Sequence, residues 1–274
     1  MNETVHENYV EAGKIAGKVR NESISRIKED VPLLEVAEYS EDRIKELGGN
    51  IAFPCNISID EIASHYTPED NIERFCRGDV VKIDIGVHIE GFIADTASTI
   101  EIGTKNHGML IKSTEEALDR AIGSIKDNVQ TSQVGKIIEE TIEKYGFSTL
   151  RDLTGHSLEK YTLHSGVTIP NYCAFFSNRI KKDMVFAVEP FATYGKGDIK
   201  YGKTHIFSIR PGTCEGLNGK FGFLPFAKRW IPELITENLK GLREYPELIE
   251  ASGNIVAQSE HTVIVHERGC EIIT

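Results

Sequence analysis

The segment DVVKIDIGVHIEGFIADTAST, from Asp79 to Thr99, decides the fold of this chain. It contains two runs rich in β-forming residues, 80–87 and 92–100, separated by the four residues 88–91. A connection this short between two such runs is typical of a hairpin. We therefore predict an antiparallel pair of strands.

Each of these two runs carries one aspartate. If the turn centres between Ile89 and Glu90, Asp84 and Asp95 lie directly opposite each other, with Cβ atoms about 4.5–5.5 Å apart. The neighbouring residues are mostly apolar, so two charges there need a shared proton or a cation. Aspartates on the solvated outer face of a hairpin are the commoner arrangement. The apolar strands favour a metal site instead.

The composition limits the class of protein. A chain of 274 residues is long enough for one large domain, with or without an inserted subdomain. The net charge of −11 argues against a nucleic-acid-binding surface, so we expect no DNA partner. The sequence has neither the pattern of a signal peptide nor an apolar run of membrane-spanning length. Its five scattered cysteines include no CxxC pair, which favours reduced thiols and a cytoplasmic protein.

The order of the predicted elements indicates an α+β fold. Helices are expected at 4–29, after Pro32, at 41–47, at 110–125 and at 133–145. Strands are expected at the start of 51–58, which then becomes a loop at Pro54 and Asn56, and at 183–191, 203–209, 254–265 and 271–274. Residues 211–250 read as an excursion, with a glycine-rich loop followed by a helical stretch at 232–243.

Other polar residues stand out against apolar or glycine-rich surroundings. His65 lies in a loop before the hairpin, where a histidine is more often a surface residue than a catalytic one. His156 and His164 lie in a glycine-flanked segment and are, by themselves, as consistent with an ordinary loop as with a metal site. Two further carboxylates, Glu189 and Glu260, lie at or within apolar strands, where an unpaired charge is costly.

Together, Asp84, Asp95, His156, Glu189 and Glu260 supply four carboxylates and one imidazole. Such a donor set suits Mn²⁺, Fe²⁺, Co²⁺ or Zn²⁺ in a catalytic setting better than a structural zinc site, which favours cysteine and histidine. Four carboxylates balance about two divalent cations. Paired cations ~3.5–4 Å apart are used by hydrolases to activate water.

Seven motifs occur in order along the chain: AFPCNIS, HYTP, KIDIGVHIEGFIADTA, GHSLEKYTLHSG, FAVEPF, LPFAKRW and QSEHT. With them the chain resembles the methionine aminopeptidases of type II, in their compact archaeal-like form, over essentially its whole length. The resemblance implies a pita-bread fold of two pseudo-symmetric αβ halves. It also implies a single catalytic domain, 1–274, with an inserted helical subdomain at about 207–250.

The resemblance also implies a role for each matching residue. Asp84 matches a bidentate ligand of one of two divalent metal ions (Co, Mn, Fe or Zn), His156 and Glu189 match ligands of the other, and Asp95 and Glu260 match bridging ligands. Glu189 matches the proton shuttle as well. His65 and His164 match catalytic histidines that also contact the substrate, and Phe53 matches a wall of the methionine pocket.

The resemblance further implies a substrate and a setting. The substrate is the N-terminal methionine of nascent polypeptides, which implies transient proximity to the ribosome, and a monomer without membrane contact is expected. The sequence departs from the family pattern at Cys55 and Ser259 and in a shortened 207–230 segment. None of these departures removes a ligand.

Two rival functions share the expected fold. A proline-specific peptidase would keep the five ligands, but it normally carries an additional N-terminal domain, for which we expect no room here. A non-catalytic pita-bread binding protein would lack some of the ligands and would have a basic surface. This chain keeps all five ligands and is acidic. The HYTP loop favours the methionine enzyme.

Overall fold

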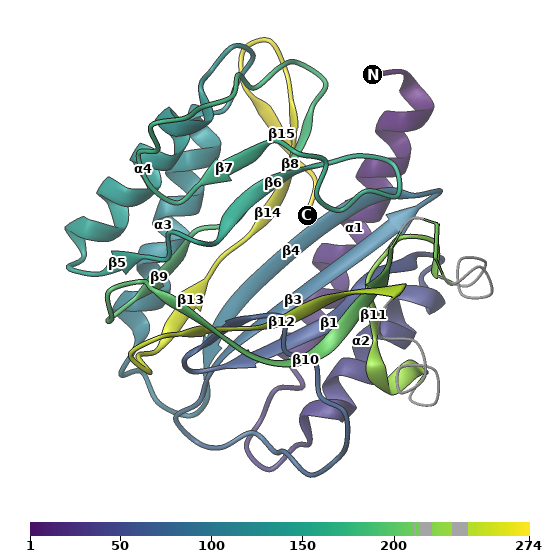
Figure 1. The fold of residues 1–274 in the computed structure, drawn as a ribbon, viewed down its shortest axis with the longest axis vertical. Helices are drawn as coiled ribbons and strands as arrows, with labels where there is room; N and C mark the ends of the chain where they lie inside the picture. The colour runs from purple at the N-terminus through teal and green to yellow at the C-terminus, as the bar shows by residue number, and fades with distance from the viewer. Residues whose placement is uncertain (211, 214–220, 232–240) are drawn as a thin grey trace.

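A computed structural model describes residues 1–210, 212–213, 221–231 and 241–274 (Figure 1). Its α-helices are α1 (Glu3–Ile24), α2 (Leu33–Glu46), α3 (Gly108–Ser124) and α4 (Thr131–Lys144). The strands before α3 are β1 (Asn50–Ile59), β2 (Ile62–Ser64), β3 (Val80–Ile89) and β4 (Phe92–Glu101). Those after α4 are β5 (Ser148–Thr149), β6 (Thr154–Leu158), β7 (Thr168–Pro170), β8 (Val185–Val188), β9 (Phe191–Thr193), β10 (Ile199–Ile209), β11 (Phe226–Ala227), β12 (Leu242–Glu250), β13 (Val256–Gln258), β14 (His261–Val265) and β15 (Cys270–Ile272), with a 3₁₀ turn, η1 (Lys228–Trp230). None of the described helices is long and apolar enough to span a bilayer.

Two helix-covered halves build the molecule (Figure 1). In the first, α1 and α2 cover a sheet of order β1-β3-β4. In the second, α3 and α4 cover two sheets, of order β13-β9-β5 and β15-β14-β8-β6-β7, with which they share an apolar core. A fourth sheet, of order β11-β10-β12-β2, crosses in front of the first (Figure 1).

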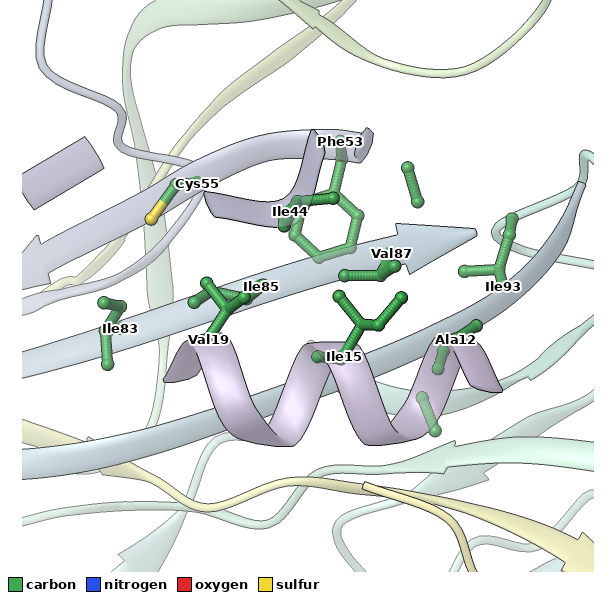
Figure 2. Packing of buried hydrophobic residues seen from close by; sticks show 14 of the residues in the cluster. Ala12, Ile15, Val19, Ile44, Phe53, Cys55, Ile83, Ile85, Val87 and Ile93 are labelled. Carbon is green, nitrogen blue, oxygen red and sulfur yellow. The ribbon is translucent and has the colours of Figure 1, made fainter. Parts of the chain in front are cut away.

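The buried face of α1 shows why the first sheet and its helices stay together. Ala12, Ile15 and Val19 are spaced by three and four residues and therefore form one stripe along the helix. Figure 2 shows this stripe packed against Ile85 and Val87 of β3. Each of these side chains is at least 95% buried, and burying one stabilises the fold by roughly 1.5–3 kcal/mol for the larger aliphatic residues.

The predicted hairpin is confirmed, but its predicted register is wrong. Asp84 pairs with Ala97, and Asp95 pairs with Gly86, so the two aspartates are diagonal neighbours on one face. The strands run on to Ile89 and Phe92, leaving a two-residue turn in which Glu90 (φ 52°) and Gly91 (φ 88°) are both left-handed. That conformation suits the right-handed twist of a hairpin. It moves the turn centre one residue further along the chain than expected.

Two further boundaries differ from the prediction. The helices expected after Pro32 and at 41–47 form one continuous helix, α2. The loop expected at Pro54 and Asn56 is absent, because β1 continues to Ile59 and absorbs these residues as irregularities in its pairing with β3. The predicted helices at 110–125 and 133–145 are confirmed as α3 and α4.

Among the described residues, the inserted helical subdomain expected at 207–250 is not evident. Those in this range form the end of β10, β11, the short turn η1 and β12, with a single helical position at Phe221. Residues 232–240, which make up most of the helix expected at 232–243, lie outside the described residues. β10 and β12 pair antiparallel along most of their length, so the described part of this range is mainly a β-ribbon.

Two helical glycines give opposite predictions for the same substitution. A Cβ on Gly13 would lie 2.2 Å from the backbone oxygen of Ile273, whereas nothing lies within 4 Å of a Cβ on Gly123. Alanine favours a helix by about 1 kcal/mol over glycine, and overpacking costs about 1–3 kcal/mol. Gly123→Ala should raise the free energy of unfolding in urea, and Gly13→Ala should lower it. A stabilising Gly13→Ala would show that α1 does not pack this closely.

Candidate metal centre

All eight residues that the sequence singled out line one small cavity of about 60 Å³. They are Phe53, His65, Asp84, Asp95, His156, His164, Glu189 and Glu260. They come from both helix-covered halves and from the loops around them. Residues as far apart in sequence as Phe53 and Glu260 thus meet at one site.

The five expected ligands are close to one another. Donor atoms of Asp95, His156 and Glu260 all lie within 4.8 Å of one another. Nε2 of His156 is 3.7 Å from Oδ2 of Asp95 and 3.6 Å from Oε1 of Glu189. The fifth, Asp84, lies diagonally opposite Asp95 on the same face of the hairpin.

Threonine side chains hold the two halves of this site in register. Thr262 of β14 accepts a hydrogen bond from the Asp95 backbone nitrogen and donates one to the Asp95 carbonyl oxygen, both 2.8 Å long. Thr96 of β4 donates to the Glu260 carbonyl oxygen at 2.9 Å. Because these bonds join the backbones of Asp95 and Glu260 to the opposite strand or loop, the two residues cannot move apart without breaking them.

The carboxylates lack the hydrogen bonds that buried charges require. Oδ1 of Asp84, Oδ1 of Asp95 and Oε2 of Glu260 are buried and have no hydrogen-bond partner among the described residues. A buried polar atom without a partner is rare in native proteins and commonly marks a missing ion or water. Three such oxygens in one cavity fit the donor set of a bound cation.

The acid–base properties of the site support the same fit. Burial raises the pKa of Asp84 to about 7, and burial together with the neighbouring carboxylates raises the pKa values of Asp95 and Glu260 well above the ordinary range. The pKa of Glu189 is raised in the same way, by burial and then by Asp84. Burial lowers the pKa of His156 well below 6.5, which leaves a neutral imidazole able to ligate a metal. Divalent cations would relieve the repulsion among the four carboxylates, and these residues fit them.

The two other histidines are also neutral. Burial lowers the pKa values of His65 and His164 to about 4. Nδ1 of His65 lies 3.2 Å from the Pro246 carbonyl oxygen, which can only accept, so this nitrogen carries the hydrogen. Nε2 of His65 therefore holds the lone pair. The ring of His164 lies 4.3 Å from that of His156, centroid to centroid.

Phe53 forms one wall of the cavity and rests on the hairpin. A Cβ on Gly86 would lie 2.1 Å from the Phe53 ring, so only glycine permits this contact. Sequence reasoning missed several other lining residues, namely Asn56, Ser64, Leu163, Ile206, Pro225 and Tyr245. Most of them lie inside or next to the quoted motifs. Tyr245, however, lies in the range expected to form the inserted subdomain, and only its pairing in β12 reveals it.

Comparison with known proteins agrees with the fold and the site. The model of the family described as Metallopeptidase family M24 matches residues 7–267. The methionine aminopeptidase of Methanocaldococcus jannaschii is 42% identical over 290 residues, covering 98% of each chain. That of Archaeoglobus fulgidus is 42% identical over 292 residues, covering 100% of each. This chain therefore belongs to metallopeptidase family M24 and, within it, to the methionine aminopeptidases.

Solved structures share the fold at lower identity. A methionine aminopeptidase from Thermotoga maritima has a TM-score of 0.79 at 24% identity, covering 100% of this chain and 98% of that one. A thermophilic Arx1 has a TM-score of 0.86 at 16% identity, covering 100% and 91%. These likenesses confirm the mixed α/β pita-bread fold.

The raised carboxyl pKa values predict how the metal-free protein responds to pH. Asp84 has an ordinary pKa of 3.8 when unfolded and about 7 when folded, so between these values the folded state holds a proton that the unfolded state releases. The free energy of unfolding should therefore fall as pH rises from 4 to 7, by at most about 1.4 kcal/mol per pH unit for one carboxyl. The melting temperature of chelated protein, measured from pH 5 to 8, checks this.

The control for this measurement is Asp84→Asn, which removes one titrating group and should give a shallower decline. Adding Mn²⁺ at pH 8 should restore stability by RT ln(1 + [M]/Kd). Parallel pH curves for both proteins, or a melting temperature unaffected by the metal, would contradict this explanation of the acidic cavity.

Proposed function

We propose that this chain removes the N-terminal methionine from polypeptides by metal-assisted hydrolysis. The observation that carries the proposal is the meeting of four buried carboxylates, three neutral histidines and the Phe53 ring around one cavity of about 60 Å³. Its relatives at 42% identity, which match this chain along nearly their whole length, are methionine aminopeptidases.

Five residues of the cavity would hold two divalent cations (Co, Mn, Fe or Zn): Asp84, Asp95, His156, Glu189 and Glu260. Asp95 and Glu260 would hold the cations at the seam between the two halves of the site, where Thr262 and Thr96 bond their backbones. When bound, such cations make a hydroxide nucleophile available near neutral pH and polarise the scissile carbonyl. The chain itself must then position the substrate and move protons.

Glu189 is suited to move the proton. Its Oε2 accepts a weak hydrogen bond from Nε2 of Gln258 at 3.5 Å, and its backbone oxygen accepts one from Asn171 at 3.2 Å. Its raised pKa brings the carboxyl towards the range in which a group both accepts and returns a proton near neutral pH. Glu189 takes the proton of the attacking water and gives it to the departing amine.

We assign His65 and His164, which line the same cavity, to contacts with the substrate. The lone pair on Nε2 of His65 accepts a hydrogen bond from a substrate N–H, because Nδ1 is already committed to the Pro246 carbonyl. His164 is neutral and presents an N–H to the oxygen on which negative charge develops. A donor in that position stabilises the transition state more than the ground state.

We further propose that residues 1–274 form one catalytic domain, whose two αβ halves are related by a pseudo-twofold axis. It works as a monomer in the cytoplasm on nascent polypeptides, in transient proximity to the ribosome. A proline-specific activity is the alternative of the same fold. Hydrolysis of Met-Ala-Ser against Ala-Pro, with added Mn²⁺ or Co²⁺, tests the choice, and cleavage of Ala-Pro alone would refute the methionine assignment.

Substitutions should separate the metal ligands from the histidines. Asp95→Asn and Glu260→Gln should lose both bound metal and activity, because each removes a charged donor from the group that would hold the cations. His65→Gln should lower kcat by about 10²-fold or more while metal stays bound. Elemental analysis and kcat measured on the same preparations check this, with the exposed His266→Gln as control. A metal-free His65→Gln protein would place His65 among the ligands.

The shape of the cavity predicts the choice of first residue. An unbranched side chain can reach past the ligands to Phe53, and a thioether contacts an aromatic ring with about 0.3–1.5 kcal/mol of stabilisation. A misfit of one methylene costs about 1–3 kcal/mol, so leucine should be removed slowly, whereas β-branched valine places its bulk beside the ligands. The expected order of kcat/KM is Met-Ala-Ser, then Leu-Ala-Ser, then Val-Ala-Ser. Equal values would indicate a general aminopeptidase.

A further inference from the structure

A second, larger cavity opens beside the catalytic cavity. Its volume is about 650 Å³, and it shares Leu163, His164, Pro225 and Tyr245 with the catalytic cavity. These shared residues connect the two cavities, so a peptide whose first residue occupies the catalytic cavity extends past them into the larger one. The larger cavity, here named the vestibule, therefore lies on the path of the residues that follow.

The β10–β12 ribbon lines both cavities, and its lining residues become more polar from the catalytic cavity to the vestibule. On β10, Ile206 lines the catalytic cavity, while Ser208, Ile209 and the next residue, Arg210, line the vestibule. Ile206, Ser208 and Arg210 are at alternate positions. On β12, Tyr245 lines both cavities and Arg243 lines the vestibule alone. Side chains at alternate positions of a strand share a face and are about 6.6 Å apart along it, so Arg210 lies ~13 Å from Ile206.

The pairing of the two strands brings the arginines to the same end. Ser208 pairs with Arg243, and its hydroxyl lies 3.3 Å from the hydroxyl of Tyr245. The backbone nitrogen of Arg210 continues the ladder by donating to Gly241 at 3.0 Å. An extended peptide advances about 3.3 Å per residue, so the third to fifth substrate residues would pass these two guanidiniums.

The charge of the vestibule differs from that of the whole chain. The net charge of the chain is −11, yet Arg210 and Arg243 are the charged residues among the described lining of the vestibule. Within the described part of the chain, neither guanidinium forms an ion pair with a carboxylate. Arg210 donates from Nε to the Leu242 carbonyl oxygen at 2.8 Å, and Arg243 lies 5.8 Å from the centre of the Tyr245 ring.

The carboxylate of Glu244, the nearest acidic residue on β12, does not pair with the guanidinium of Arg210 or Arg243. Glu244 follows Arg243 on β12 and therefore belongs to the opposite face, where its carboxylate accepts a hydrogen bond from Thr204 at 3.3 Å. Both guanidiniums thus keep most of their donors for a carboxylate from outside the chain, to which an arginine can bind through two parallel hydrogen bonds.

We propose that the vestibule is a binding subsite for acidic side chains at the third to fifth residues of the substrate, with Arg243 and Arg210 as its specificity-determining residues. The inference rests on the proposed aminopeptidase function and adds a preference within its substrates. Each arginine is partly solvated, so each ion pair is worth a few-fold in affinity, and two together should give about three- to tenfold.

Three hexapeptide amides with the same first two residues test the subsite. They are Met-Ala-Ser-Ser-Ser-Gly, Met-Ala-Glu-Glu-Glu-Gly and Met-Ala-Lys-Lys-Lys-Gly. The kcat/KM of the acidic peptide should exceed that of the neutral one by about three- to tenfold, mainly through KM, and the basic peptide should be the poorest. In 0.5 M NaCl the acidic-to-neutral ratio should fall towards one, because salt screens exposed charges.

Charge variants locate the effect. In the double variant Arg210→Gln/Arg243→Gln the acidic-to-neutral ratio should fall towards one at low salt. The matched control Arg120→Gln/Lys136→Gln makes the same change in net charge on α3 and α4, away from the ribbon, and should keep the wild-type ratio (Figure 1). If the double variant does not fold, the single variant Arg210→Gln replaces it. Its acidic-to-neutral ratio of kcat/KM should lie between one and the wild-type value.

The outcomes separate this inference from the proposed function. If no methionine peptide is cleaved by the metal-loaded enzyme, the proposed function fails. If the neutral peptide is cleaved and the wild-type ratio is one, or the ratio survives in the arginine variants, the subsite is refuted and the aminopeptidase function stands.

Discussion

The burial of four carboxylates in one cavity is the constraint on which the rest of this structure depends. Charges placed this close in an apolar interior repel one another and lose hydration, so they must be protonated or neutralised by cations. The fold nevertheless holds them there, through backbone pairing of β3 with β4 and through Thr96 and Thr262 at the seam. Stability given up at the site is therefore recovered elsewhere, notably in the apolar core beneath the hairpin.

Arg20, a residue of α1, supports the hydrogen bond between Thr96 and the Glu260 backbone. The Arg20 guanidinium donates to the Thr96 hydroxyl, which in turn donates to the carbonyl oxygen of Glu260. Arg20 is 9% exposed and is held by the same helix whose apolar stripe covers the hairpin. The packing of α1 and the placement of Glu260 are thus parts of one arrangement.

The loop that carries His65 is fixed by a separate set of contacts, which gives the LPFAKRW motif a structural role. His65 itself has a left-handed backbone (φ 66°), which is unfavourable for a non-glycine residue unless its surroundings hold it. Arg229 donates to the Thr67 hydroxyl at 2.6 Å, and Lys228 binds the carboxylate of Glu69 at 3.1 Å. His205 of β10 lies 2.9 Å from the same carboxylate. These bonds link the loop to η1 and β10. Because β10 also lines the vestibule, the His65 side of the catalytic cavity and the wall of the vestibule are held to the same strand.

The sequence by itself determined the chemistry of the site. The residue types of Asp84, Asp95, His156, Glu189 and Glu260, set in apolar surroundings, were enough to predict a cluster of metal donors, and the structure brings all five to one cavity. The ordered motifs added the family, and amphipathic periodicity predicted α3 and α4.

Only the tertiary structure decided how these parts meet. The register of the hairpin depends on the turn at Glu90 and Gly91, where the left-handed conformation of two residues moves the pairing by two positions in a way that alternation alone does not specify. The strand predicted at 203–209 is part of β10, but its partner β12 was missed, because pairing between distant strands, unlike a helix, leaves little local periodicity. Tyr245 and the two arginines therefore became visible only when β10 and β12 were placed side by side, since their shared face is a property of the pair and not of either segment.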